Sequence, residues 1–221
     1  MNTDPFILNP LLASIRKDFV KGDLTEETVS VDPMLQFERW LKEAFAQGNE
    51  LANAMVLSTV DSNSMPSSRV MLLRDVSFGG FTFFTNYQSR KANEINTNKK
   101  VALLFFWPEL ERQVRIEGVI RKLPEQESDA YFASRPFESQ VAAWTSNQST
   151  KVNSRKELDQ KYANDLKKYN DDTVLRPPHW GGYVLKPLNI EFWQGRANRL
   201  HDRIEFTLNS KNEWEMRRLM P

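Results

Sequence analysis

The sequence predicts an α+β protein, mainly β with added helices, whose strands form an antiparallel barrel. Short runs rich in Val, Leu, Ile, Phe and Met follow one another with only polar turns between them. These turns are too short for parallel crossovers, which need about a dozen or more residues, so the strands pair antiparallel. Consecutive strands of this kind are typical of barrels and sandwiches. The first five predicted strands span residues 54–60, 68–76, 80–86, 101–107 and 111–123.

A helix precedes this series of strands. Asp32 is suited to cap the helix, and Pro33 is suited to its first position, where no backbone N–H is needed. Apolar residues then recur at helical spacing until Gly48, and Trp40 falls on the apolar face. We therefore expect Trp40 in the core and not in a ligand site.

The remaining elements and the domain organisation follow from the same patterns. We expect residues 1–30 to be a flexible N-terminal segment and residues 31–221 to be a single domain, with a helical insertion at about 124–170. Predicted helices span residues 89–97, 124–134, 137–144 and 153–169. Further predicted strands span 183–185, 190–193 and 204–208, and 213–219 is suited to pair with the last of them.

The composition excludes several classes of protein. The 30 basic and 29 acidic side chains give a net charge of +1, so neither a nucleic acid nor a membrane is an expected partner. The absence of cysteine and the presence of only two histidines argue against disulfides and metal sites. No apolar run approaches a membrane span or a signal peptide, which predicts a cytoplasmic protein. Glycine-rich phosphate loops are also absent, so side chains must bind any nucleotide.

The segment NIEFWQGRANRLHDR, residues 189–203, is unusually dense in charge. If residues 199–203 are extended, Arg199, His201 and Arg203 point to one side, and Leu200 and Asp202 to the other. Arginine side chains bind phosphate or carboxylate through paired hydrogen bonds, so this side would bind an anion. The alternative is a solvated, charged turn that closes a hairpin.

A second candidate anion site lies in the segment SRKANEI, residues 89–95. Ser89 is suited to cap a helix, which puts Arg90 and Lys91 in its first turn. Cations are disfavoured at a helix N-terminus unless an anion binds there too. A phosphate site is one interpretation, and an ordinary surface helix with solvated charges is the other.

Together, many segments of the chain resemble the pyridoxine/pyridoxamine 5'-phosphate oxidase family. The resemblance runs from about residue 32 to residue 221. It is carried by DPMLQFERWL, SSRVMLLRDV, GFTFFTN, SRKANEI, FFWPELERQVRIEG, YFASRPFESQ, SNQS, HWGGY, IEFWQGRANRLHDR and RRLMP, in that order. It implies an antiparallel FMN-binding split β-barrel that forms a homodimer with FMN at the subunit interface.

The resemblance also implies a reaction and a site. Pyridoxine 5'-phosphate and pyridoxamine 5'-phosphate would be oxidised by O2 to pyridoxal 5'-phosphate, with release of H2O2 and, from the amine, NH3. The implied FMN contacts are the strand from Arg69 to Arg74, and Phe84, Thr85, Arg90, Lys91, Gln113, Gln148, Ser149, Trp193 and Arg203. The implied substrate contacts are Arg74, Tyr131, Arg135, Ser139, Arg199, Leu200, His201 and, from the N-terminal segment, Arg16. Arg199 and His201 would be the catalytic residues.

Three residues depart from the pattern of the family. Arg74 stands where lysine is usual, and Phe84 and Phe19 stand where some members have tyrosine. Arginine keeps the charge of lysine but is longer and forked, and each phenylalanine lacks a hydroxyl. In a regular strand Arg69 and Arg74 would also point to opposite faces, because they are an odd number of residues apart. A two-fold assembly would allow both to meet a ligand.

Two other functions are compatible with parts of the sequence. A non-catalytic flavin or pyridoxal-phosphate carrier on the same barrel would keep the phosphate-binding residues but not turn over. Single-stranded nucleic-acid binding would use the arginines that alternate with aromatic residues, although the near-zero net charge disfavours it.

Overall fold

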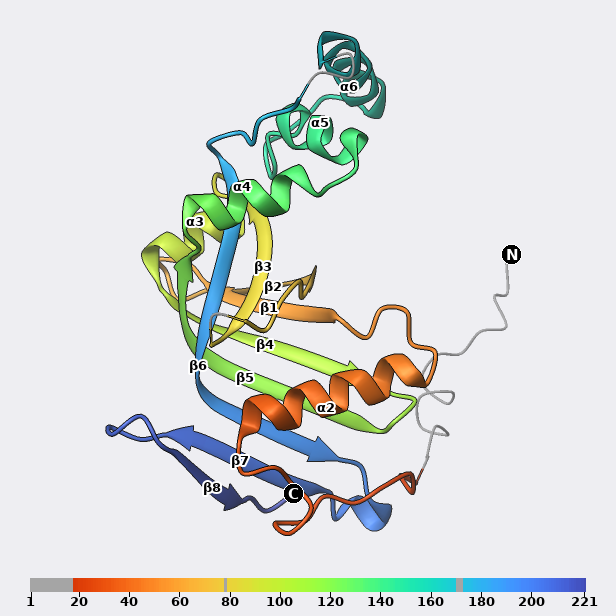
Figure 1. Cartoon of the computed structure of the whole chain (residues 1–221), viewed down its shortest axis with the longest axis vertical. Helices are drawn as coiled ribbons and strands as arrows, with labels where there is room; N and C mark the ends of the chain where they lie inside the picture. The colour runs from red at the N-terminus through yellow and green to blue at the C-terminus, as the bar shows by residue number, and fades with distance from the viewer. Residues whose placement is uncertain (1–17, 78, 170–172) are drawn as a thin grey trace, which may run out of the picture.

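The computed structural model describes residues 18–77, 79–169 and 173–221. In this part of the chain one antiparallel sheet of eight strands curves around an apolar core, with the helices outside it (Figure 1). The elements in chain order are α2 Pro33–Ala46, β1 Ala54–Val60, β2 Pro66–Leu72, β3 Phe81–Asn86, α3 Arg90–Thr97, β4 Lys100–Trp107, β5 Arg112–Lys122, α4 Glu125–Ala133, α5 Phe137–Thr145, α6 Arg155–Tyr169, β6 Trp180–Gln194, η1 Ala197–Arg199, β7 Asp202–Leu208 and β8 Trp214–Arg218.

Helix α2 closes one side of the core, as the sequence predicts. The Oδ1 atom of Asp32 accepts a hydrogen bond from the N–H of Met34 at 2.8 Å, which satisfies one free donor at the helix start. Trp40 is buried and its ring meets Phe192 of β6 edge to face, with 5.3 Å between centroids. The expected core position of Trp40 is therefore confirmed.

Strand β6 connects the two ends of the molecule. The sequence predicts two strands, 183–185 and 190–193, and this is wrong, because one strand of 15 residues covers both. Its first part pairs with β3, its last part pairs with β7, and β5 pairs with it along both parts. The register shifts between Glu117 and Gly118, opposite Pro187. A Cβ on Gly118 would lie 2.1 Å from the carbonyl oxygen of Lys186, so glycine is required at this irregularity.

Strand β2 ends at Leu72 and not at residue 76. Beyond it, the N–H of Arg74 donates to the carbonyl of Thr82 at 2.8 Å, and Asp75 forms an isolated bridge with Thr82. The chain thus leaves β1 and turns to β3 between Leu72 and Arg74. Arg69 and Arg74 do not belong to one regular strand, so the expected opposition of their side chains does not apply.

The helical insertion has an apolar cluster of its own. Phe132, Val141, Ala143, Val174 and Trp180 are buried together, which holds α4 and α5 against the start of β6. Helix α6 has no buried residue. The predicted helices in this region are confirmed to within a few residues, and β8 pairs with β7. In the part of the chain that the structure describes, no helix is long and apolar enough to cross a membrane.

Candidate functional site

The predicted phosphate site at the start of α3 is a connected polar network. Lys91 is buried, and its Nζ donates to Oε1 of Gln148 at 2.8 Å and to Oγ1 of Thr85 at 3.2 Å. The N–H of Arg90 donates to Oγ of Ser149 at 3.2 Å. Ser89 occupies the capping position, but its hydroxyl donates back to the carbonyl of Asn86 and makes no capping bond. The structure therefore brings Thr85, Arg90, Lys91, Gln148 and Ser149 together.

Glu94 is the centre of this network, and the sequence analysis missed it. Its carboxylate is buried and accepts hydrogen bonds from Thr59, from Ser67 at 2.7 Å, and from the guanidinium groups of Arg69 at 3.1 Å and Arg90 at 2.8 Å. Burial opposes its charge, but these hydrogen bonds and Arg69 together lower the pKa of Glu94 to about 2. The i, i+4 spacing from Arg90 was the one signal in the sequence.

The buried cation of this network has a perturbed pKa. Burial, and then repulsion from Arg69, lower the pKa of Lys91 to about 8, while the charge of Glu94 acts in the opposite direction. A dianion beside Lys91 would favour its charged form. This part of the chain is therefore suited to bind a phosphate through Arg69, Arg90 and Lys91.

A cavity of about 280 Å³ adjoins the network, between β3, α4, α5 and the start of β6. Phe84 and Tyr131 stack inside it with 3.7 Å between ring centroids, and Trp180 extends the stack. The guanidinium of Arg135 lies 4.6 Å from the centre of the Trp180 ring. Arg74, exposed, also lines the cavity.

Arg135 carries an unsatisfied donor in this cavity. Its Nη1 is buried and has no hydrogen-bond partner among the described residues. Burial lowers the pKa of Arg135, and repulsion from Arg74 lowers it further, whereas Tyr131 acts to raise it. An anion between Arg74 and Arg135 would accept the free hydrogen bond of Arg135 and reduce the repulsion between the two arginines. Ser139 lies in the first turn of α5 and does not line the cavity.

A second group of predicted residues lies on β5, β6 and β7. Gln113 is opposite Trp193, and Trp193 is opposite Arg203, so the three side chains form a row across the sheet. The Nε and Nη2 atoms of Arg203, on one edge of the guanidinium, donate to the two oxygens of the buried Glu191 carboxylate, at 2.9 and 3.0 Å. Glu191, which the sequence analysis also missed, thereby fixes the direction of Arg203.

The turn between β6 and β7 differs from the extended form that the sequence analysis considered. Residues Ala197–Arg199 form a short 3-10 turn, and both Asn198 and Arg199 have positive φ, of 56° and 60°. This backbone breaks the two-residue period, so Arg199, His201 and Arg203 do not form one row. The backbone of the segment is a turn that closes a hairpin. Arg199 and Leu200 are exposed at its tip.

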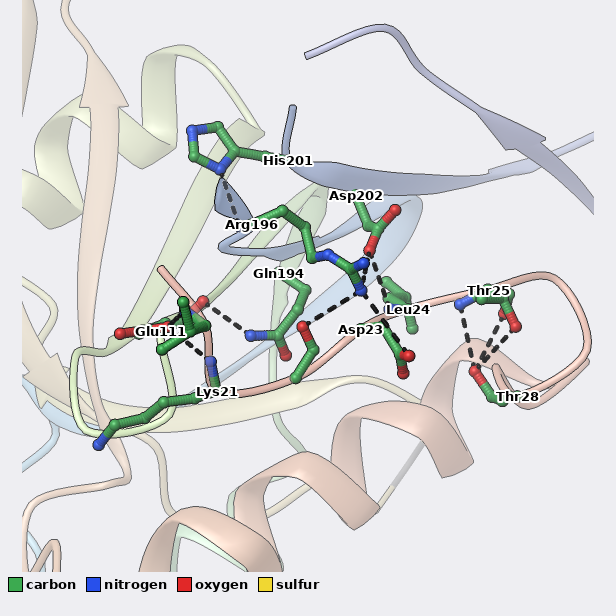
Figure 2. A network of polar contacts seen from close by, with 12 residues as sticks. Lys21, Asp23, Leu24, Thr25, Thr28, Glu111, Gln194, Arg196, His201 and Asp202 are labelled. Atoms are coloured by element: carbon green, nitrogen blue, oxygen red, sulfur yellow. Dashed lines mark hydrogen bonds and ion pairs between the residues drawn. The ribbon is translucent and has the colours of Figure 1, made fainter. Parts of the chain in front are cut away.

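His201 is held more firmly than its neighbours at the tip. Its Nδ1 accepts a hydrogen bond from the N–H of Arg196 at 3.1 Å (Figure 2). Its ring lies 4.7 Å from the ring of Trp193 and 5.6 Å from that of Phe19. Because Nδ1 accepts, a neutral His201 carries its proton on Nε2.

The predicted site residues therefore form two groups. The upper group contains Arg69, Arg74, Phe84, Thr85, Arg90, Lys91, Tyr131, Arg135, Ser139, Gln148 and Ser149. The lower group contains Gln113, Trp193, Arg199, Leu200, His201 and Arg203. Figure 1 shows α4 and α5 at one end of the molecule and β7 and β8 at the other, so one chain does not bring the two groups together. Arg16 lies outside the described residues.

Comparison with known proteins gives consistent matches. Residues 41–164 match the family model described as pyridoxamine 5'-phosphate oxidase, and residues 180–221 match that of the pyridoxine 5'-phosphate oxidase C-terminal dimerisation region. A pyridoxine/pyridoxamine 5'-phosphate oxidase of Cupriavidus necator is 50% identical over 95% of this chain and 99% of its own. The enzyme of the same name from Leptospira biflexa is 49% identical over the same shares.

Solved structures agree with these matches. PhzG from Burkholderia lata, in complex with tetrahydrophenazine-1-carboxylic acid, has a TM-score of 0.85 at 28% identity and covers 91% of this chain and all of its own. A pyridoxamine 5'-phosphate oxidase-related, FMN-binding protein of Nostoc punctiforme has a TM-score of 0.70 at 16% identity, over 87% of this chain and all of its own. The fold is thus that of the FMN-binding split-barrel flavoproteins. Within this class, the chain belongs to the pyridoxine/pyridoxamine 5'-phosphate oxidase family.

Membership of this family defines the general properties of the chain. It is an FMN-dependent oxidoreductase, and the match to the dimerisation region identifies a homodimer. The upper group fits FMN, because it gathers two arginines, Arg69 and Arg90, and the buried Lys91 in one polar network, and cations of this kind bind phosphate. The expected fold and cofactor are confirmed.

Proposed function

We propose that the chain oxidises pyridoxine 5'-phosphate and pyridoxamine 5'-phosphate to pyridoxal 5'-phosphate. Each turnover reduces one O2 to H2O2, and the amine substrate also consumes one water and releases NH3. The observation that carries the proposal is the cavity beside the FMN-phosphate network, where Arg135 has a buried nitrogen without a partner among the described residues. A second phosphate-binding position beside a flavin suits a phosphorylated substrate. The proposal includes a cytoplasmic location, which the absence of cysteine supports.

Each site in this proposal is formed by two chains. The upper group can supply the phosphate contacts, but Trp193, Arg199 and His201 lie between the end of β6 and the start of β7, and β7 is at the other end of the molecule. In a two-fold dimer the lower group of one chain can meet the upper group of its partner, which gives two equivalent sites. The match of residues 180–221 to a dimerisation region supports this arrangement, because the segment contains β6, β7 and β8.

In this assembly the upper group would hold the FMN phosphate through Arg69, Arg90 and Lys91. Thr85 and Gln148 already contact Lys91, which orients its ammonium group. From the other chain, the row of Gln113, Trp193 and Arg203 would contact the rest of the cofactor. Bound FMN supplies the hydride acceptor for the oxidation.

The substrate phosphate would bind between Arg74 and Arg135, with Tyr131, which lines the same cavity, as a further contact. Arg199 would place its charge against the substrate ring and stabilise negative charge that develops there. His201 presents an N–H at Nε2, because Nδ1 accepts from Arg196. In this tautomer His201 orients the substrate by donating a hydrogen bond, and it does not act as a base at Nε2.

The visible spectrum of the FMN-loaded protein tests the proposal directly. Under anaerobic conditions, pyridoxine 5'-phosphate should bleach the absorbance of bound flavin, and air should restore it. A flavin that stays oxidised with both pyridoxine and pyridoxamine phosphates would favour the carrier function. Failure to retain FMN would contradict the cofactor site as well.

A further inference from the structure

An N-terminal strap, defined as residues 18–30, is attached to the barrel beside the lower group by hydrogen bonds and not by pairing in the sheet. Two carboxylates of the barrel accept backbone N–H groups of the strap. Glu111 accepts from Val20 and Lys21, and Asp202 accepts from Leu24 at 3.1 Å (Figure 2). The strap therefore has a defined path beside His201.

Glu111 is an unusual residue for a turn between two strands. Only 1% of its surface is exposed, and its φ is 55°. Its Oε2 accepts the two N–H groups at 2.7 and 3.0 Å, and its own carbonyl accepts the N–H of Gly195 at 2.8 Å. A buried carboxylate is costly unless such donors surround it, so Glu111 strongly favours the docked strap.

Phe19, the residue next to this anchor, lies on Gly195. A Cβ at Gly195 would be only 2.7 Å from the Cβ and Cγ atoms of Phe19, so the contact requires glycine. The ring of Phe19 meets both Trp193 and His201 edge to face, at 5.7 and 5.6 Å between centroids. The strap thus places the aromatic ring of Phe19 beside His201.

We propose that Glu111 is a positioning residue, which holds Phe19 against Trp193 and His201 and thereby fixes the orientation of the His201 ring. The charge of Glu111 does not need to reach the substrate, because it acts through the backbone of Val20 and Lys21. The effect on turnover rests on the function proposed above, whereas the effect on His201 does not.

The first test observes His201 without any turnover. The chain has two histidines, so His179 is an internal reference in an NMR spectrum of the FMN-loaded dimer labelled at histidine. Glu111→Ala should shift or broaden the His201 resonance and leave that of His179 in place. Glu111→Gln, whose side-chain oxygen still accepts both N–H groups, should resemble the unaltered protein.

The second test separates binding from chemistry. Glu111→Ala should raise KM for pyridoxine 5'-phosphate about tenfold and change kcat less than about twofold, since the substrate is oriented less well. Glu109→Ala is the matched control, because its carboxylate binds Asn49 and not the backbone of the strap. Adding Phe19→Ala to Glu111→Ala should cause no further loss, because Glu111 acts through Phe19.

Val20→Pro gives an independent variant that keeps the carboxylate. Val20 is 76% exposed, and proline removes the N–H that donates to Glu111 while it restricts the backbone only at residues 19 and 20, so the barrel should fold even if Glu111→Ala does not. The proposal fails if the His201 resonance is unchanged in Glu111→Ala and Val20→Pro. It also fails if the His179 resonance shifts equally and Glu111→Gln does not restore the original spectrum. If the His201 resonance shifts as expected but the protein does not oxidise either substrate, the positioning role of Glu111 is supported and the proposed reaction is contradicted.

Discussion

The upper and lower groups of site residues differ in how their charged side chains are paired and exposed. In the upper group, cations converge on one buried carboxylate, Glu94, and Arg135 keeps a buried donor that no described residue satisfies. In the lower group, Arg203 is already paired with Glu191, and Arg199 stands exposed on a turn with positive φ. The upper group thus keeps a buried donor for an anion at Arg135, whereas the lower group exposes the charge of Arg199 at the tip of a turn. This difference indicates that anion binding and ring orientation depend on separate parts of the fold.

Among the variants that test this division, Arg199→Ala should have the largest effect on catalysis. Arg199→Ala should lower kcat/KM by roughly 100- to 1,000-fold, because a charge that stabilises the transition state is lost. FMN retention, measured by flavin fluorescence after gel filtration, should not change. Arg155→Ala on α6, which breaks a surface pair with Asp159, is the control for removal of an arginine. Loss of FMN in Arg199→Ala would show that Arg199 binds the cofactor, and that the roles of the upper and lower groups are exchanged.

Mixed dimers test whether the two groups meet across the interface. Arg135→Ala damages only the upper group and Arg199→Ala only the lower group, so each homodimer should be nearly inactive. A heterodimer of the two contains one site with neither change. Co-expression should therefore restore about a quarter of the activity of the unaltered protein, since half of the dimers are mixed and each has one intact site. Activity no higher than that of the single variants would place each site within one chain.

Arg90→Ala should act on the cofactor and not on the chemistry. We expect the Kd for FMN to rise about twentyfold, since a charge-assisted contact to phosphate is removed. At saturating FMN, kcat should be within about twofold of its original value. A fluorescence titration with FMN measures the first effect and steady-state assays the second. A large loss of kcat at full FMN occupancy would contradict the separation of the two groups.

The smallest expected effect is a change in the affinity for FMN with pH. Lys91 in the free protein has a pKa of about 8, below its ordinary value, because of burial and Arg69. The FMN phosphate is a dianion above pH 7 and raises that pKa in the complex. Lys91 is charged in both states below pH 8, but above it the free protein must take up a proton to bind. The Kd should therefore rise about tenfold between pH 7 and 9.5. Lys91→Arg, which does not titrate there, should remove this rise.

The sequence predicted local features far better than non-local ones. Asp32, Pro33 and the apolar spacing around Trp40 determine α2 through neighbours in the chain, and that helix is confirmed. The burial of Glu94 depends on Thr59 and Arg69, which come from other strands, so helical spacing alone could not reveal it. Pro187 concealed that β6 is one strand, because proline usually ends a strand in the middle of a sheet.

The candidate site was predicted residue by residue from family resemblance, but its arrangement was not. The 3-10 turn at Ala197–Arg199 was not predicted, because Arg199 has a positive φ, which residues other than glycine and asparagine rarely adopt. Similarly, only the fold reveals that α4 and α5, which flank Arg135, and β7, which follows Arg199, lie at opposite ends of the molecule.

Strand β6 makes the molecule intolerant of changes in chain length. Its 15 residues would span about 50 Å if straight, at about 3.3 Å a residue, and it carries Trp180 at one end and Trp193 near the other. Deletion of a single residue between them would turn every later side chain to the opposite face. Both the pairing with β7 and the direction of Trp193 would be lost together. A single deletion in β6 would therefore alter both ends of the sheet, whereas a substitution there alters one position.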